Sequence, residues 1–158
     1  MTRADADAQQ PRVLEIHVAP GRRLPTRSVP SVEAEAGRGL VGDRYHGSKH
    51  RHVTVQARDE LDLAAADLGA DVPSGLTRRN ITVDHGPLPS RPGELLRIGP
   101  VLLEVVRVAA PCRILDDEIG RGAAAALRRR AGTVFRILES GTIRVGDPVS
   151  VVPPAADA

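Results

Sequence analysis

The chain has 158 residues, a net charge of +2 and 41% hydrophobic residues, the composition of one globular domain. Its single cysteine, Cys112, excludes an internal disulfide and any Cys-rich zinc or iron–sulfur site. Two aromatic residues, Tyr45 and Phe135, are too few for a stacking platform for single-stranded nucleic acid. No apolar run approaches the about 20 residues of a membrane helix, and the N-terminus has no signal-peptide pattern. We therefore expect a cytoplasmic protein that binds neither membranes nor nucleic acids.

Short β segments between two tails dominate the chain. Residues 1–11 and 153–158 are predicted to be disordered tails, which leaves one domain over residues 12–152. Gly99-Pro100 and Glu139-Ser140-Gly141 each separate two β segments and indicate hairpins. Alternating or β-branched runs predict strands over residues 13–18, 32–36, 52–56, 80–83, 95–98, 101–109, 134–138, 142–145 and 148–152.

Two helices interrupt the strands. Residues 57–68 place Leu61, Ala64, Ala65 and Leu68 on one face, and the Ala-rich residues 122–130 predict a second helix. This order lacks the strand–helix alternation of a doubly wound fold. We expect a mainly β protein, a mostly antiparallel closed β-barrel with two or three short helices, because closure removes exposed sheet edges.

Cys112 is the first candidate for chemistry. Pro111 ends the long apolar strand directly before it, so the thiol falls at a strand end, where reactive groups are common. The nearby Arg107 and Arg113 would favour its thiolate form. The alternative is a small buried apolar residue, as most free cysteines are.

Two further segments combine glycine, arginine and polar side chains. All but one of the 22 basic residues are arginines, whose planar fork suits oxyanions, although most of them could simply form a solvated surface. In residues 39–47, Asp43, Arg44 and His46 stand among three glycines, and backbone N–H groups there could bind an anion. The alternative is a tight turn capped by Asp43. Arg78, Arg79 and Asn80 enter a strand from a loop, either as an anion site or as an exposed connection.

His46, His50 and His52 form the only pattern with metal-ligand character. Lys49 and Arg51 lie between them, and their positive charges oppose the binding of a metal cation. A zinc site, and with it a zinc-dependent hydrolase, is the third and least favoured possibility.

Five segments in order resemble the MOSC domain, the family named after the C-terminal domain of molybdenum cofactor sulfurase. The resemblance covers about residues 12–152, and no single segment is specific. The matching segments are Gly39-Leu-Val-Gly-Asp-Arg-Tyr-His-Gly47, Gly75-Leu-Thr-Arg-Arg-Asn-Ile-Thr-Val83, Pro92-Gly-Glu-Leu-Leu-Arg-Ile-Gly99, Leu103-Glu-Val-Val-Arg107 with Pro111-Cys112, and Gly141-Thr-Ile-Arg-Val-Gly-Asp-Pro-Val149.

The resemblance implies a β-barrel and a functional Cys112 that carries sulfur as a persulfide or contacts molybdenum. With it, Arg44, Arg78 and Arg79 are expected to hold the pterin phosphate of the molybdenum cofactor or another oxyanion. Asp43 and Asn80 complete the expected cofactor site, and Asn80 would orient a polar edge of the ligand. His46 is expected to be a proton donor or a residue that supports the groups in contact with the ligand.

The resemblance also implies a stand-alone member of the family that depends on partners. The chain has no desulfurase domain, and its one lysine lacks the context for a Schiff base, so pyridoxal phosphate is not expected to bind. A partner would supply sulfur or, as a reductase, electrons for the reduction of N-hydroxylated compounds. The competing hypothesis is a non-catalytic anion-binding or interaction module in which Cys112 is buried and inert.

Overall fold

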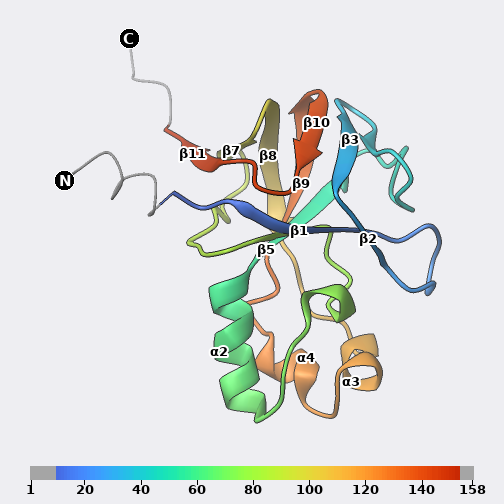
Figure 1. Cartoon of the computed structure of the whole chain (residues 1–158), viewed down its shortest axis with the longest axis vertical. Helices are drawn as coiled ribbons and strands as arrows, with labels where there is room; N and C mark the ends of the chain where they lie inside the picture. The colour runs from blue at the N-terminus through green and yellow to red at the C-terminus, as the bar shows by residue number, and fades with distance from the viewer. Residues whose placement is uncertain (1–9, 154–158) are drawn as a thin grey trace.

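A computed structural model describes residues 10–153 of the chain. Strands fill one half of the molecule, and three short helices pack together at its other end (Figure 1). The helices are α2 (Arg58–Leu68), α3 (Ile114–Glu118) and α4 (Ala123–Ala126), with a 3₁₀ turn, η1 (Ser74–Leu76). None of the helices in the described part is long and apolar enough to cross a membrane.

The strands form two sheets. The larger has the order β11-β7-β8-β9-β5-β6-β1-β2, antiparallel except for the parallel pair β5–β6. The smaller is antiparallel with the order β10-β3-β4. The strands are β1 (Val13–Val18), β2 (Arg27–Val29), β3 (Ser31–Glu35), β4 (Gly39–Leu40), β5 (Val53–Ala57), β6 (Ile81–Val83), β7 (Leu95–Ile98), β8 (Val101–Val108), β9 (Thr133–Glu139), β10 (Gly141–Arg144) and β11 (Val149–Val152).

The apolar residues form two cores. The main core lies among the strands and includes the fully buried Ile16, Leu103, Phe135 and Ile143, which come from both sheets. Strand β8 shows the expected alternation, because Val101, Leu103 and Val105 are buried while their neighbours are not. A smaller core joins the three helices.

The fold is mainly β and mostly antiparallel, as expected, but the prediction of a closed barrel is wrong. Within residues 10–153 the larger sheet ends at β11 on one side and at β2 on the other, and these two strands do not pair. Strand β2 pairs with Ile16–Val18, on the edge of β1 opposite β6. The residues just before β1 and just before β11 meet in the isolated bridge Arg12–Pro148, which lies outside the named strands.

All nine predicted strands exist, with shifts of one residue at several ends. The hairpin around Gly99-Pro100 is confirmed, since Ile98 pairs with Val101. The second predicted hairpin is wrong, because β10 pairs with β3 and not with β9. Strand β8 pairs along β9 as far as Glu139, whereas β5 pairs on the other edge only with Thr133–Phe135. Strands β2 and β4, which are only three and two residues long, were not predicted from the sequence.

The predicted helix over residues 57–68 is confirmed as α2, with Leu61 and Ala64 buried. Its C-cap Gly69 adopts a φ of 75°, and the Gly69 N–H donates to Ala65 O. The helix predicted over residues 122–130 is much shorter: α4 ends at Ala126, and Arg129 has a φ of 63° that no helix accommodates. The five residues of α3 were too few to show a periodic pattern. The predicted tails lie largely outside the described residues.

Candidate anion-binding site

Four connecting segments meet around a cavity of about 290 Å³. They follow β1, precede β5, precede β6 and follow β8, so residues far apart in the sequence share one site. Half of the twelve lining residues are arginines, and none is acidic. The lining residues are Arg22, Arg23, Arg44, Tyr45, Arg51, Thr77, Arg78, Arg79, Ala110, Cys112, Ile114 and Leu115.

A buried polar contact between Asp43 and Asn80 holds these segments together. The Asp43 carboxylate accepts the Ala19 N–H at 2.9 Å, the Tyr45 N–H at 3.3 Å and the Asn80 side-chain N–H at 3.2 Å. The Asn80 side-chain oxygen accepts the Thr54 N–H at 3.0 Å. Asp43 and Asn80 are each only 6% exposed and do not line the cavity. They therefore hold the arginine-bearing segments together from outside the cavity lining.

Arg79 brings a positive charge into the floor of the cavity. It is 6% exposed, and its Nε and Nη2 groups donate to the carbonyl oxygens of Ala131 and Ala110, at 3.0 and 2.9 Å. Burial, together with a smaller effect of the nearby Arg51, lowers the pKa of Arg79 to about 10, although Tyr45 and Cys112 oppose this shift. At neutral pH the side chain stays charged, and no carboxylate of residues 10–153 forms an ion pair with it.

Arg51 and Arg78 are half-buried and incompletely bonded. Arg51 Nε and Arg78 Nη2 are buried atoms with no hydrogen-bond partner in the described part of the chain. Burial is the main cause that lowers the pKa of both side chains, and the charge of Arg44 lowers both further. Arg78 also has a φ of 66°, an uncommon conformation for a residue with a side chain. An anion in the cavity would supply the acceptors that these guanidinium groups lack.

Tyr45 organises two of the arginines. The guanidinium carbons of Arg44 and Arg51 lie 4.7 and 4.3 Å from the centroid of its ring. At these distances both cations are attracted to the ring face. The stacking restricts both side chains before any ligand arrives.

The Cys112 thiol is exposed and borders two cavities. One is the arginine-lined cavity. The other, of about 340 Å³, is also lined by Arg23, Arg113, Ile114 and Asp117. The thiol is thus accessible from solvent while it remains next to the buried cation Arg79.

The structure brings together some of the predicted site residues and separates others. Arg44, Arg78, Arg79 and Cys112 line one cavity, as the combined prediction requires. His46 lies elsewhere, with its Nε2 atom 2.7 Å from Glu35 Oε1. The sequence analysis assigned no role at this cavity to Tyr45, Arg51, Arg22 or Arg23. Tyr45 lies within the glycine-rich segment, but only the fold shows that Arg51 faces the same cavity.

The three histidines do not form a metal site. Both ring nitrogens of the buried His52 are in use, since Nδ1 accepts the Ile137 N–H and Nε2 bonds to Ser48 O. His50 lines a separate cavity with Glu104 and Arg136. Within residues 10–153 no three His, Cys, Asp or Glu side chains are placed to hold a metal ion.

The fold and the site together define a mainly β protein with a thiol-bearing, arginine-lined cavity at the ends of its strands. A family model described as the MOSC domain matches residues 42–150, more than half of the chain. The chain therefore belongs to the MOSC domain family. No curated protein sequence matches it significantly.

Solved structures support the same fold. The YuaD protein from Bacillus subtilis has a TM-score of 0.77 at 13% sequence identity, over 89% of this chain and 94% of that one. YiiM from Geobacillus stearothermophilus has a TM-score of 0.70 at 17% identity, over 90% and 75% of the two chains. YiiM from Escherichia coli has a TM-score of 0.67 at 17% identity, over 92% and 72%. At these identities the likeness establishes the fold alone.

Proposed function

We propose that the arginine-lined cavity binds the molybdenum cofactor through its anionic pterin portion, with the Cys112 thiolate beside it. One observation carries the proposal: the only thiol of the chain borders the same cavity as six arginines. The MOSC family is associated with this cofactor. Guanidinium groups suit the phosphate of the cofactor, and a thiolate suits its sulfur-coordinated metal.

The residues present fit such a ligand. Among residues 10–153, Arg51 Nε and Arg78 Nη2 have no acceptor, and no acidic side chain lines the cavity to compete with an anion. Arg78 and Arg79 would hold the phosphate, while Tyr45 keeps Arg44 and Arg51 in place. Cys112 would offer a thiolate to the bound group. When bound, the cofactor supplies the metal and its redox chemistry.

Sulfur transfer is a second role for the same thiol, favoured by its exposure to solvent. In that reaction the Cys112 thiolate attacks the outer sulfur of a persulfide on a partner protein. A new sulfur–sulfur bond forms on Cys112, and the bond to the donor sulfur breaks as the donor thiolate leaves with the electron pair. The exposed thiol disagrees with the competing hypothesis of a non-catalytic module, which expects a buried and inert Cys112.

Intact mass together with metal and pterin analysis of the isolated protein tests the proposal. We expect bound pterin in the wild-type protein, and its loss in Arg51→Gln/Arg78→Gln. Cys112→Ser should keep the pterin but lose the molybdenum or the extra sulfur atom. Arg91→Gln, an exposed arginine outside the cavity, is the matched control and should behave as wild type. Unchanged pterin and molybdenum in both the arginine and the cysteine variants would refute the proposal.

A further inference from the structure

A second cavity, of about 480 Å³, lies at the opposite end of β5 and is larger than the arginine-lined one. It borders the start of α2, the segment after β6, the end of β8 and the turn before β9. Ala57, Pro87, Leu88 and Val108 give it an apolar wall. Val108 is 46% exposed, so part of this wall is open to solvent.

Three charged residues line this cavity, namely Glu60, Arg129 and Arg130, and the first two form no ion pair within residues 10–153. Glu60 comes from the first turn of α2 and Arg129 from the turn that follows α4. Neither side chain forms an ion pair with any residue between 10 and 153, so their charged atoms are more than 4.0 Å apart. The neighbouring Arg130, by contrast, is neutralised by Asp67. One cation and one anion are therefore available to a ligand.

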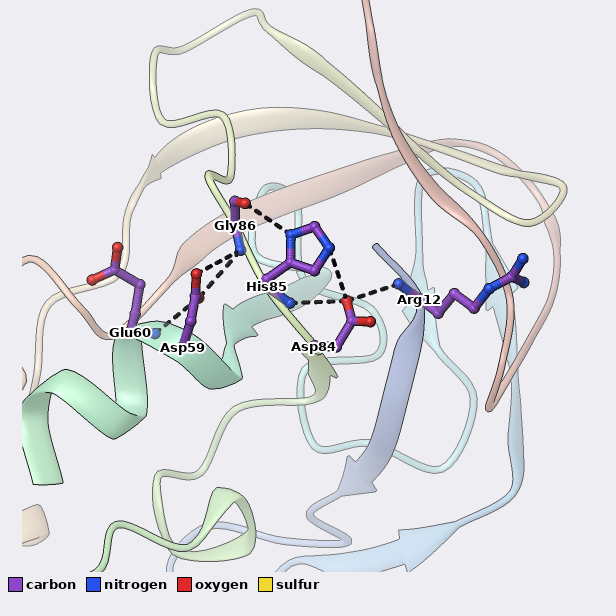
Figure 2. A network of polar contacts seen from close by, with 6 residues as sticks. All are labelled: Arg12, Asp59, Glu60, Asp84, His85 and Gly86. Carbon is purple, nitrogen blue, oxygen red and sulfur yellow. Dashed lines mark hydrogen bonds and ion pairs between the residues drawn. The ribbon is translucent and has the colours of Figure 1, made fainter. Parts of the chain in front are cut away.

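The wall beside Glu60 is fixed by a polar network (Figure 2). The Asp59 carboxylate accepts the Gly86 N–H at 3.2 Å, and Asp84 accepts the N–H groups of His85 and Arg12 at 2.9 and 3.0 Å. These bonds hold the segment that leads into Pro87 and Leu88. In the same view the Glu60 carboxylate points away from the network. Glu60 thus remains free while its neighbour Asp59 holds the wall.

The opposite wall is equally constrained. The Gly132 oxygen accepts the Ala109 N–H at 2.9 Å, which ties the turn before β9 to the end of β8. Gly132 lies so close to the backbone of Val55 that no side chain fits there. Arg129 adopts its φ of 63° within this turn. Arg129 lies shortly before Gly132, whose backbone is held against Ala109 and Val55.

We propose that this cavity binds a small zwitterion, an α-amino acid with an aliphatic side chain. Its carboxylate would pair with the Arg129 guanidinium, and its ammonium group with the Glu60 carboxylate. The aliphatic side chain would contact Leu88 and Val108, which removes their apolar surface from water. The site is separate from the arginine-lined cavity, so the inference goes beyond the proposed function and does not depend on it.

Calorimetric titration with L-leucine tests this site. We expect saturable binding, weaker by roughly tenfold or more for leucinamide, which lacks the carboxylate, and for isocaproate, which lacks the ammonium group. Arg129→Gln and Glu60→Gln should each weaken leucine binding to a similar extent. Arg128→Gln, an exposed neighbour outside the cavity, is the matched control and should bind as wild type.

The single-charge analogues need no variant, so they decide the question even if a variant fails to fold. Absence of saturable leucine binding would overturn the inference, and so would equal binding of isocaproate and leucine. Cys112→Ser should bind leucine as the wild type does, whatever the outcome of the pterin analysis. Loss of leucine binding in Cys112→Ser would contradict the separation of the two sites.

Discussion

Replacing Asp43 by alanine should destabilise the protein strongly, because it removes the acceptor of three N–H groups at once. The buried Ala19 N loses its acceptor, the buried Asn80 Nδ2 loses one of two acceptors and keeps His17 O at 3.1 Å, and the Tyr45 contact at 3.3 Å is longer and only partly buried. A buried donor left without a partner costs about 1–3 kcal/mol, and each further hydrogen bond lost costs about 0.5–1.5 kcal/mol. We therefore expect Asp43→Ala to lower the free energy of unfolding by about 2–4 kcal/mol. Asp43→Asn retains one acceptor oxygen and should cost less.

Urea unfolding measures this difference, since a chain of this size has an m-value of about 1–3 kcal/mol/M. The unfolding midpoint of Asp43→Ala should fall by roughly 1–3 M. The control is Asp62→Ala, which removes only an i,i+4 ion pair with Arg58 on the surface of α2 and should cost about 0.5 kcal/mol or less. If Asp43→Ala costs no more than Asp62→Ala, the buried contact does not hold the cavity segments.

Four further outcomes follow from the same geometry. Gly132→Ala should lower the free energy of unfolding in urea by more than about 4 kcal/mol, because a Cβ there would lie 2.0 Å from Val55 O. The control Gly37→Ala has no atom within 4 Å of its Cβ and should cost about 1 kcal/mol. Burial lowers the pKa of His17 and His52 below 6.5, so the unfolded state binds more protons than the folded state near that pH. The free energy of unfolding should therefore be highest above about pH 6.5 and should fall as the pH is lowered through the folded-state pKa values. In His52→Gln it should depend less on pH. Tyr45→Phe should keep the stacking of Arg44 and Arg51 and the affinity for phosphate, whereas Tyr45→Leu should weaken phosphate binding by calorimetry about two- to fivefold. Phosphate should raise the thermal midpoint of the wild-type protein more than chloride at equal ionic strength, and this difference should disappear in Arg51→Gln/Arg78→Gln.

The strands were predictable because most of them show a local sequence pattern that indicates a strand. The alternation of β8 between buried and partly buried residues is local, and so is the Gly99-Pro100 turn that joins it to β7. The pairing of β10 was not predictable from Glu139-Ser140-Gly141, because a turn signal does not show that the next strand will pair with the distant β3 instead of with β9. Whether the sheet closes depends on β2, a three-residue strand within a segment rich in proline and arginine.

The residues of the arginine-lined cavity were likewise predictable only in part from the sequence. The sequence analysis singled out Cys112, Arg44, Arg78 and Arg79 by residue type and position, and the structure places them in one cavity. It could not distinguish residues that face the cavity from those that support it, because Asp43 and Asn80 belong to the same motifs as Arg44 and Arg79. That distinction depends on side-chain direction and burial, as with His46, which turns to Glu35. No local sequence pattern indicates that Glu60 and Arg129 share a cavity, because only the fold places both of them along its lining.

The two classes of residue at the arginine-lined cavity have opposite electrostatic roles. Asp43 and Asn80 form a buried, fully bonded contact that stabilises the fold whether or not a ligand is present. Arg51, Arg78 and Arg79 bring mutually repelling charges into a partly desolvated space that no carboxylate of the described residues lines, an arrangement that costs stability in the free protein. A bound anion removes this cost by supplying charge and acceptors together. Binding and stability are therefore coupled at this cavity, and the rigid contact behind it keeps the arginines converging while the site is empty.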